Sequence, residues 1–176
     1  MREFLLLIFL FLLGSSCQKA SYYGPDDQPV FFEYRYVNYA WGVSDHGWLI
    51  DKEGNIRGFE FPLDFRVPDS TGHVSLEDLE HNLSLADTLL SSISSKEFEK
   101  HIRLIRGAAD GNLGERTPRG ADMGSSILSC YAFDPEIGSY TYVLLARKGD
   151  WEQQNLSAEA EKLVKWLKEL EELSFY

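Results

Sequence analysis

Two pairs of apolar runs, each joined by a short polar turn, limit this chain to folds that contain antiparallel strands. In the first pair, residues 48–50 and 56–61 flank the turn 51–55. In the second pair, residues 126–133 and 140–147 flank the turn 134–138. Gly54 and Gly138 supply the positive φ that tight hairpin turns require. Residues 30–39, rich in Phe, Tyr and Val, are typical of one more strand. We therefore predict about five strands, four of them in two hairpins.

Three segments show the three-and-four spacing of an amphipathic helix. Apolar residues recur at this spacing from Leu76 to Ile93, over residues 96–106, and from Ala160 to Leu170. A serine suited to capping precedes each segment, namely Ser75, Ser94 and Ser157. The expected fold class is α+β: an antiparallel sheet of about five strands, packed on one side with about three helices.

The beginning of the chain has the pattern of a secretory signal. The apolar run 4–13 is too short for a membrane span but fits the apolar region of a signal peptide. Gly14, Ser15 and Ser16 then lead into Cys17. This end resembles the bacterial lipoprotein signal, in which a peptidase cuts before a lipid-modified cysteine. The resemblance implies a diacylglycerol on Cys17 and an acylated amino terminus, enough chains for stable anchoring. A plain signal peptide with an incidental cysteine is the alternative.

The same resemblance divides the chain into three parts. Residues 1–16 are the expected signal peptide, residues 17–29 the lipidated amino terminus with a flexible tether, and residues 30–176 a single α+β domain. Gln18 replaces the Asp that retains some lipoproteins on the inner membrane. The resemblance therefore implies a location in the bacterial cell envelope, lipid-anchored at the outer membrane.

Two further stretches combine Trp, Gly and Asn. The first stretch comprises residues 38–42, Gly47 and residues 50–54. The second comprises residues 149–151, Asn155 and residues 165–167. Together they resemble a family of small, uncharacterised envelope lipoproteins, a resemblance that implies no activity. From the residues themselves, Gly42 and Gly47 bracket a turn, and we expect Trp41 to be buried.

The charge balance narrows the range of partners. The chain carries a formal net charge of −11. This argues against nucleic acid as a partner, and against direct binding of the domain to an anionic membrane surface. We expect contact with the membrane through the amino-terminal lipid, and an unknown protein or a small anionic ligand as a second partner.

The sequence contains no recognised catalytic or nucleotide-binding motif. Ser44, Asp45 and His46 are the three residue types of a catalytic triad, but adjacent side chains diverge and cannot form the relay. The four histidines are scattered, and Cys130 sits at strand spacing with apolar residues, as a buried inert thiol does. We predict no catalytic residue, no metal site and no cofactor.

A glycine-rich stretch, 107–125, stands out because it holds few large apolar residues. Long uncovered loops in small domains are usually functional or disordered. Arginines gather in and before it, and guanidinium groups suit carboxylate, phosphate or sulfate ligands. The predicted ligand-binding residues are Arg106, Asp110, Arg116 and Arg119. The alternative is that these arginines, with Arg103, pair with nearby acids and with the acidic last helix.

The function expected from these features is that of a membrane-anchored binding or interaction module. Its candidate surfaces are residues 107–124 and the aromatic N-terminal hairpins. The alternatives are an envelope or extracellular hydrolase with a site assembled only in the fold, and a purely structural lipoprotein. A deep pocket holding two or more titratable groups with shifted pKa would favour an enzyme. A flat apolar-aromatic patch would favour a partner protein.

Overall fold

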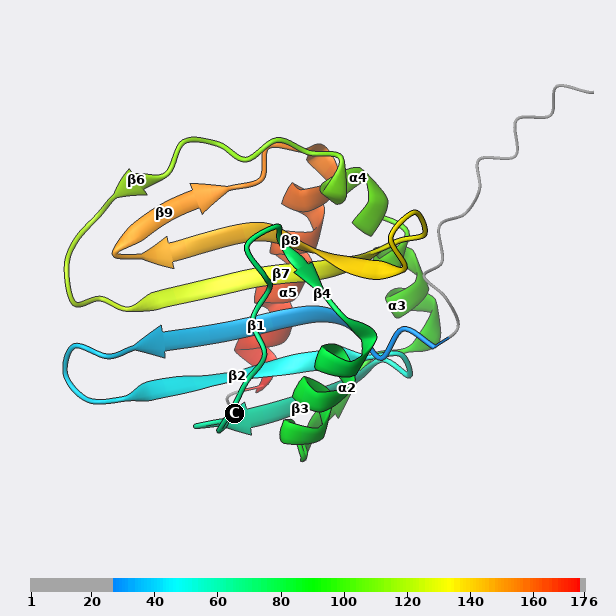
Figure 1. Ribbon diagram of the computed structural model, residues 1–176, viewed down its shortest axis with the longest axis horizontal. Helices are drawn as coiled ribbons and strands as arrows, with labels where there is room; N and C mark the ends of the chain where they lie inside the picture. Colours follow the sequence, from blue (N-terminus) through cyan, green and yellow to red (C-terminus); the bar gives the residue numbers. More distant parts are fainter. Residues whose placement is uncertain (1–26, 175–176) are drawn as a thin grey trace, which may run out of the picture.

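A computed structural model of the chain describes residues 27–174, with side chains described to residue 171 (Figure 1). Nine antiparallel strands form its sheet. Eight of them follow the spatial order β5-β3-β2-β1-β7-β8-β9-β6, and the ninth, β4, pairs with β8 at residues other than those that pair with β9. The strands are β1 Val30–Asn38, β2 Ser44–Asp51, β3 Asn55–Glu60, β4 His73–Val74, β5 Thr88–Ser92, β6 Thr117–Pro118, β7 Ser125–Asp134, β8 Ser139–Gly149 and β9 Trp151–Gln154. The predicted signal peptide, Cys17 and most of the tether lie outside the described residues.

Both predicted hairpins are present, as β2–β3 and β7–β8. In the first turn, Asp51 Oδ1 accepts hydrogen bonds from the backbone N–H groups of Glu53 and Asn55, and Gly54 adopts a φ of 78°. In the second turn, the Asp134 carboxylate accepts a backbone hydrogen bond and Gly138 adopts a φ of 64°. Side chains that fold back on the backbone stabilise both turns.

The prediction of about five strands was wrong, because four strands lack a strand pattern of their own. Two of them, β4 and β6, have only two residues each. Leu90 lies in β5, although it continues the helical spacing that begins at Leu76. The helix ends at Leu85, and the chain then turns into the sheet. The fold class is still mixed α+β.

The helices are α2 Leu76–Leu85, α3 Ser95–Ile102, α4 Ile105–Ala109 and α5 Ala158–Ser174. Serine side chains cap α2 and α3, and Ser157 Oγ accepts from the backbone N–H of Ala160 at the start of α5. The predicted segment 96–106 is divided between α3 and α4. Among the described residues, no helix is long and apolar enough to cross a membrane.

Helices cover both faces of the sheet, so the expectation of one covered side was wrong (Figure 1). On one face, Leu163 of α5 and Ile102 of α3 share a core with Trp48. On the other face, Leu79 of α2 shares a second core with Leu49 and Tyr131. Burial of both faces places the exposed features of the sheet at its ends and edges.

Candidate functional site

Three connections far apart in sequence meet at one end of the sheet, on the left in Figure 1. They join β1 to β2, β6 to β7, and β8 to β9. Asn38 Nδ2 donates to the carbonyl oxygen of Asp122 over 3.3 Å, and the Tyr36 hydroxyl donates to that of Met123 over 3.3 Å. The backbone N–H of Met123 in turn donates to Asp150 Oδ1 over 2.7 Å. These bonds hold the three connections together.

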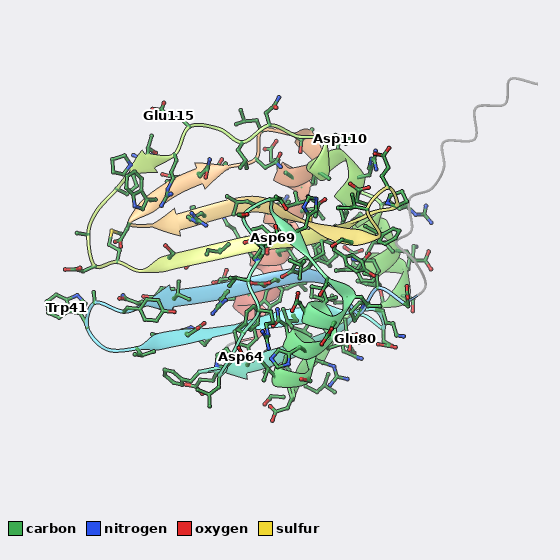
Figure 2. The ribbon with its side chains drawn as sticks, in the orientation of Figure 1. Trp41, Asp64, Asp69, Glu80, Asp110 and Glu115 are labelled. Carbon is green, nitrogen blue, oxygen red and sulfur yellow. The ribbon has the colours of Figure 1, made fainter. Side chains whose placement is uncertain are left out.

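Large apolar side chains at this end are exposed to solvent. Trp41, at the tip of the β1–β2 connection, is 84% exposed and projects away from the sheet (Figure 2). The expectation that Trp41 is buried was therefore wrong. We call the exposed apolar side chains of these connections, with the one that begins β9, the loop end; it comprises Tyr39, Trp41, Val43, Met123 and Trp151. Large apolar groups gathered on a surface mark sites of interaction.

The loop end stands on an ordered base. Asn38 Oδ1 accepts a hydrogen bond from the backbone N–H of Ala40 over 2.9 Å, which turns the chain out of β1. Gly124 lies so close to β1 that a Cβ atom there would stand 2.6 Å from the carbonyl oxygen of Val37. Its φ of 73° also favours glycine. The connections are thus fixed to the sheet directly below the exposed side chains.

The predicted ligand-binding residues lie in two separate places. Arg106 Nε lies 3.6 Å from Asp110 Oδ2, one helical turn apart at α4. Arg119 Nε donates to Glu152 Oε2 over 2.6 Å, and the Arg116 guanidinium lies 4.5 Å from the centre of the Trp151 ring. Arg116 and Arg119 thus meet β9, beside the loop end. Binding of an anionic ligand by these residues stays a prediction.

The stretch 107–125 is largely held against the sheet and α5. Its backbone pairs with β9 through β6 and through a bridge between Leu113 and Asn155. Gly111 faces Asn155, since a Cβ atom there would be 2.3 Å from the Asn155 Oδ1 atom. Close packing against the neighbouring chain accounts for this glycine without any ligand.

A polar network is buried in the face of the sheet opposite α5. Glu33 in β1 accepts a hydrogen bond from the Tyr131 hydroxyl. Burial raises the pKa of the Glu33 carboxyl and raises that of the Tyr131 phenol well above its usual value. Next to Glu33 on β1, Arg35 binds both carboxylate oxygens of Asp45, at 2.8 and 2.6 Å. Its guanidinium lies 4.3 Å from the centre of the Phe65 ring.

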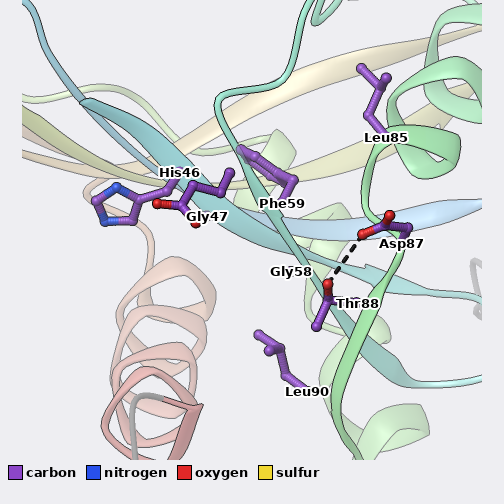
Figure 3. A pocket seen from close by; sticks show the side chains of 9 residues that line it. His46, Gly47, Gly58, Phe59, Leu85, Asp87, Thr88 and Leu90 are labelled. Carbon is purple, nitrogen blue, oxygen red and sulfur yellow. Dashed lines mark hydrogen bonds between the residues drawn. The ribbon is translucent and has the colours of Figure 1, made fainter. Parts of the chain in front are cut away.

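The described pockets do not open onto this network. One has about 590 Å³ and lies where β2, β3 and β5 come together (Figure 3). Another, of about 470 Å³, lies beside the β2–β3 turn. Neither is lined by Glu33, Tyr131 or Arg35. The network therefore acts in this structure as a set of internal contacts between β1, β2 and β7.

A third pocket brings together two groups with shifted pKa. Burial raises the pKa of Tyr34 to about 12 and lowers the pKa of Lys168. Both side chains line a space of about 160 Å³ beside α5. Pockets for small organic ligands usually have about 300–1,000 Å³. The volume is too small for a typical substrate, and a phenol with a raised pKa is a poor base at neutral pH.

His101 and Cys130 have structural surroundings. His101 stacks on Trp166 with 3.9 Å between ring centres, and its Nδ1 contacts the carbonyl oxygen of Glu97. Cys130 is buried, and burial raises the pKa of its thiol. Within residues 27–171, no group of three or more His, Cys, Asp and Glu side chains is placed to hold a metal ion.

A comparison with family models, curated proteins and solved structures finds no match to this chain. The resemblance to small envelope lipoproteins therefore stays a prediction. The candidate site rests on the geometry of the loop end. Two of its three sources, the aromatic N-terminal hairpins and the stretch 107–124, were predicted as surfaces from the sequence; the β8–β9 connection was not, and neither was the meeting of the three.

Proposed function

We propose that this protein is an interaction module of the bacterial envelope, anchored by lipid on Cys17, which binds a partner protein through the loop end. The observation that supports this most is the exposure of Trp41, Tyr39 and Met123 on neighbouring connections that hydrogen bonds join to one another. Tyr, Trp and Met are enriched where proteins meet. A fixed surface also loses little conformational entropy on binding.

Charged groups surround these apolar side chains as they do in protein interfaces. Arg119 and Glu152 form an ion pair beside Trp151, and Asp122 lies next to Met123. Apolar centres with polar rims are typical of specific interfaces. A centre of Trp and Tyr also matches the residue types that carry most binding energy in such interfaces.

The proposal is tested by crosslinking and pull-down from intact cells that express the full chain. A double variant, Tyr39→Ala with Trp41→Ala, is compared with Leu63→Ala, which removes another exposed apolar side chain away from the loop end. Hot-spot residues contribute about 2 kcal/mol or more, so we expect the double variant to recover the crosslinked partner at least about 10-fold less. The Leu63 variant should recover it as the wild type does.

Equal recovery of the same partners by wild type and the double variant would remove the loop end from the proposal. The competing functions have their own signatures. A hydrolase would release product from envelope material whether or not the loop end is intact. A purely structural lipoprotein would show neither result.

A further inference from the structure

The sheet has two outer edges, and they differ in how well they are protected. Edge strands expose unpaired backbone N–H and C=O groups, which proteins usually shield with charges, prolines or very short strands. At one edge, β6 has two residues, one of them Pro118, and stands between Arg116 and Arg119. This edge carries the usual protection against pairing with another chain.

The other edge, β5, lacks such protection. β5 has five residues, all exposed, and among the described residues its only strand neighbour is β3. The stretch 88–95 contains no charged residue and no proline. Leu89 is 60% exposed on it. An exposed, uncharged edge strand with apolar side chains is a template for one more strand.

A pocket adjoins this edge where β5 leaves the sheet. β3 continues to Glu60, whereas the last pair between the two strands is Gly58 with Thr88. The pocket of about 590 Å³ lies at this corner, with Asp87 and Thr88 on one side and Phe59 on the other (Figure 3). It is therefore continuous with the edge, and a strand that paired with β5 would pass beside it.

An irregularity in β5 directs a side chain toward the pocket. The register with β3 shifts between Ile56 and Arg57, which leaves Leu90 as the extra residue of a bulge. Leu90 lies over Gly58, since a Cβ atom added to Gly58 would be 3.1 Å from Leu90 Cδ1. Leu90 thus forms an apolar wall of the pocket.

The charge of the pocket selects for a cation. Among the described residues that line it, Glu60 and Asp87 are acidic, none is Lys or Arg, and His46 is the one basic residue. The net charge of −11 on the chain adds to the attraction of a positive group. A Lys or Arg side chain fits this combination, since its apolar stem can lie along Leu90 while its charged end meets the carboxylates.

We propose that β5 and this pocket bind an extended segment of a partner protein, which adds a strand to the sheet and directs a Lys or Arg side chain between Glu60 and Asp87. The backbone of β5 supplies affinity, and the acidic pocket supplies the choice of side chain. A second copy of this chain fits less well, because its own β5, Thr-Leu-Leu-Ser-Ser, offers no positive charge. This site is separate from the loop end.

The test measures binding of two fluorescein-labelled nonapeptides to the detergent-solubilised full chain by fluorescence anisotropy. Both peptides alternate Thr and Val, and they carry either Lys or Glu at the central position. We expect the Lys peptide to bind at least about 10-fold more tightly than the Glu peptide. Glu60→Gln combined with Asp87→Asn should abolish this preference. Leu89→Lys, at an exposed position, should weaken the binding of both peptides by charging the edge.

The Tyr39→Ala, Trp41→Ala double variant is the matched control and should bind both peptides as wild type does. If this double variant no longer captures the loop-end partner but still binds both peptides, the β5 site and the proposed function of the loop end are independent. Equal affinity for the two peptides, or binding unaffected by Leu89→Lys, would overturn the proposal. So would a concentration-dependent dimer that Leu89→Lys converts to monomer, because the edge would then belong to a second copy.

Discussion

At the scale of single residues, Glu33 is the least ordinary choice in the sheet. It is an acid 4% exposed in the middle of β1, and its carboxylate accepts a hydrogen bond from Tyr131. Burial is the main cause of its raised pKa; the Tyr131 hydroxyl and the charge of Arg35 act in the opposite direction. The folded protein therefore binds a proton at Glu33 more tightly than the unfolded chain does.

This linkage predicts how Glu33→Gln changes the response to pH. At pH values between the pKa of Glu33 in the unfolded chain and its higher pKa in the folded protein, the folded state holds more protons than the unfolded state. The stabilisation that Glu33 contributes is therefore complete below pH 4.5 and is lost as the pH rises through the pKa of the folded state. Each unit of raised pKa corresponds to about 1.4 kcal/mol. Urea denaturation at pH 5 and pH 8 should show that the wild type loses more stability over this interval than the Gln variant.

Tyr131→Phe supplies the control at the same site. The Tyr131 hydroxyl lowers the pKa of Glu33, so its removal should make the decline of stability with pH steeper than in the wild type. It also removes the hydrogen-bond partner of a buried carboxyl, at a cost of about 1–3 kcal/mol. If the wild type and Glu33→Gln lose stability in parallel from pH 5 to pH 8, the pKa of Glu33 is not raised.

At the scale of elements, local patterns predicted those parts of the fold whose determinants lie within a few residues. The β2–β3 turn was predictable because Gly54 stands between two apolar runs, and α2 because Ser75 caps it. The spacing of Leu90 suits a helix equally well, so its place in β5 depends on pairing with β3. Tertiary contacts decide such ambiguous apolar runs.

The candidate site was predictable only in pieces for the same reason. The hairpin around Trp41 and the stretch 107–124 were named from composition. Their meeting depends on β1 pairing with β7, which brings Val37 opposite Ser125. The exposure of Trp41 likewise follows from its place at the tip of a connection rather than from its apolar character.

The pairing of β1 with β2 gives a prediction at this scale, tested by Gly47→Ala. A Cβ atom at Gly47 would lie 2.0 Å from the carbonyl oxygen of Tyr34 and 3.0 Å from the Cα atom of Arg35. These are backbone atoms of β1, so the strands must shift apart. Overpacking of this kind costs about 1–3 kcal/mol, and about 1 kcal/mol lowers the Tm by about 2–4 °C in a chain of this size.

Gly107→Ala is the matched control for Gly47→Ala. A Cβ atom there would be 2.5 Å from Cγ of the half-buried Glu159, which rotation about its Cα–Cβ bond can move away, and 3.2 Å from Glu159 Cβ, which needs only a small shift of α5. Alanine also favours the helical conformation of α4 by about 1 kcal/mol over glycine. Thermal unfolding should therefore show a clear loss of Tm for Gly47→Ala and little change for Gly107→Ala. The same Tm for both variants would contradict the close approach of β1 and β2.

At the scale of the whole molecule, the strand β1 relates the proposed anchor to the proposed binding surface. β1 begins at Val30, on the side of the tether, and its 9 residues end at Asn38 beside the loop end. At about 3.4 Å per residue, this strand separates the two by about 30 Å. A lipid on Cys17 would thus attach the domain by the end of the sheet remote from Trp41, which leaves the loop end accessible to a partner.

Attachment and binding should therefore be separable by substitution. Cys17→Ala removes the proposed acylated thiol, so the protein should lose incorporated fatty acid and, because the proposed peptidase cuts before a lipid-modified cysteine, keep residues 1–16. The Cys17 variant should still bind a purified loop-end partner, because the β1–β7 pairing that forms the loop end does not involve the anchor. The Tyr39→Ala, Trp41→Ala variant should show the reverse: membrane attachment retained and the partner lost. If the Cys17 variant keeps its fatty acid, the anchor lies elsewhere and the proposed orientation of the domain has no basis.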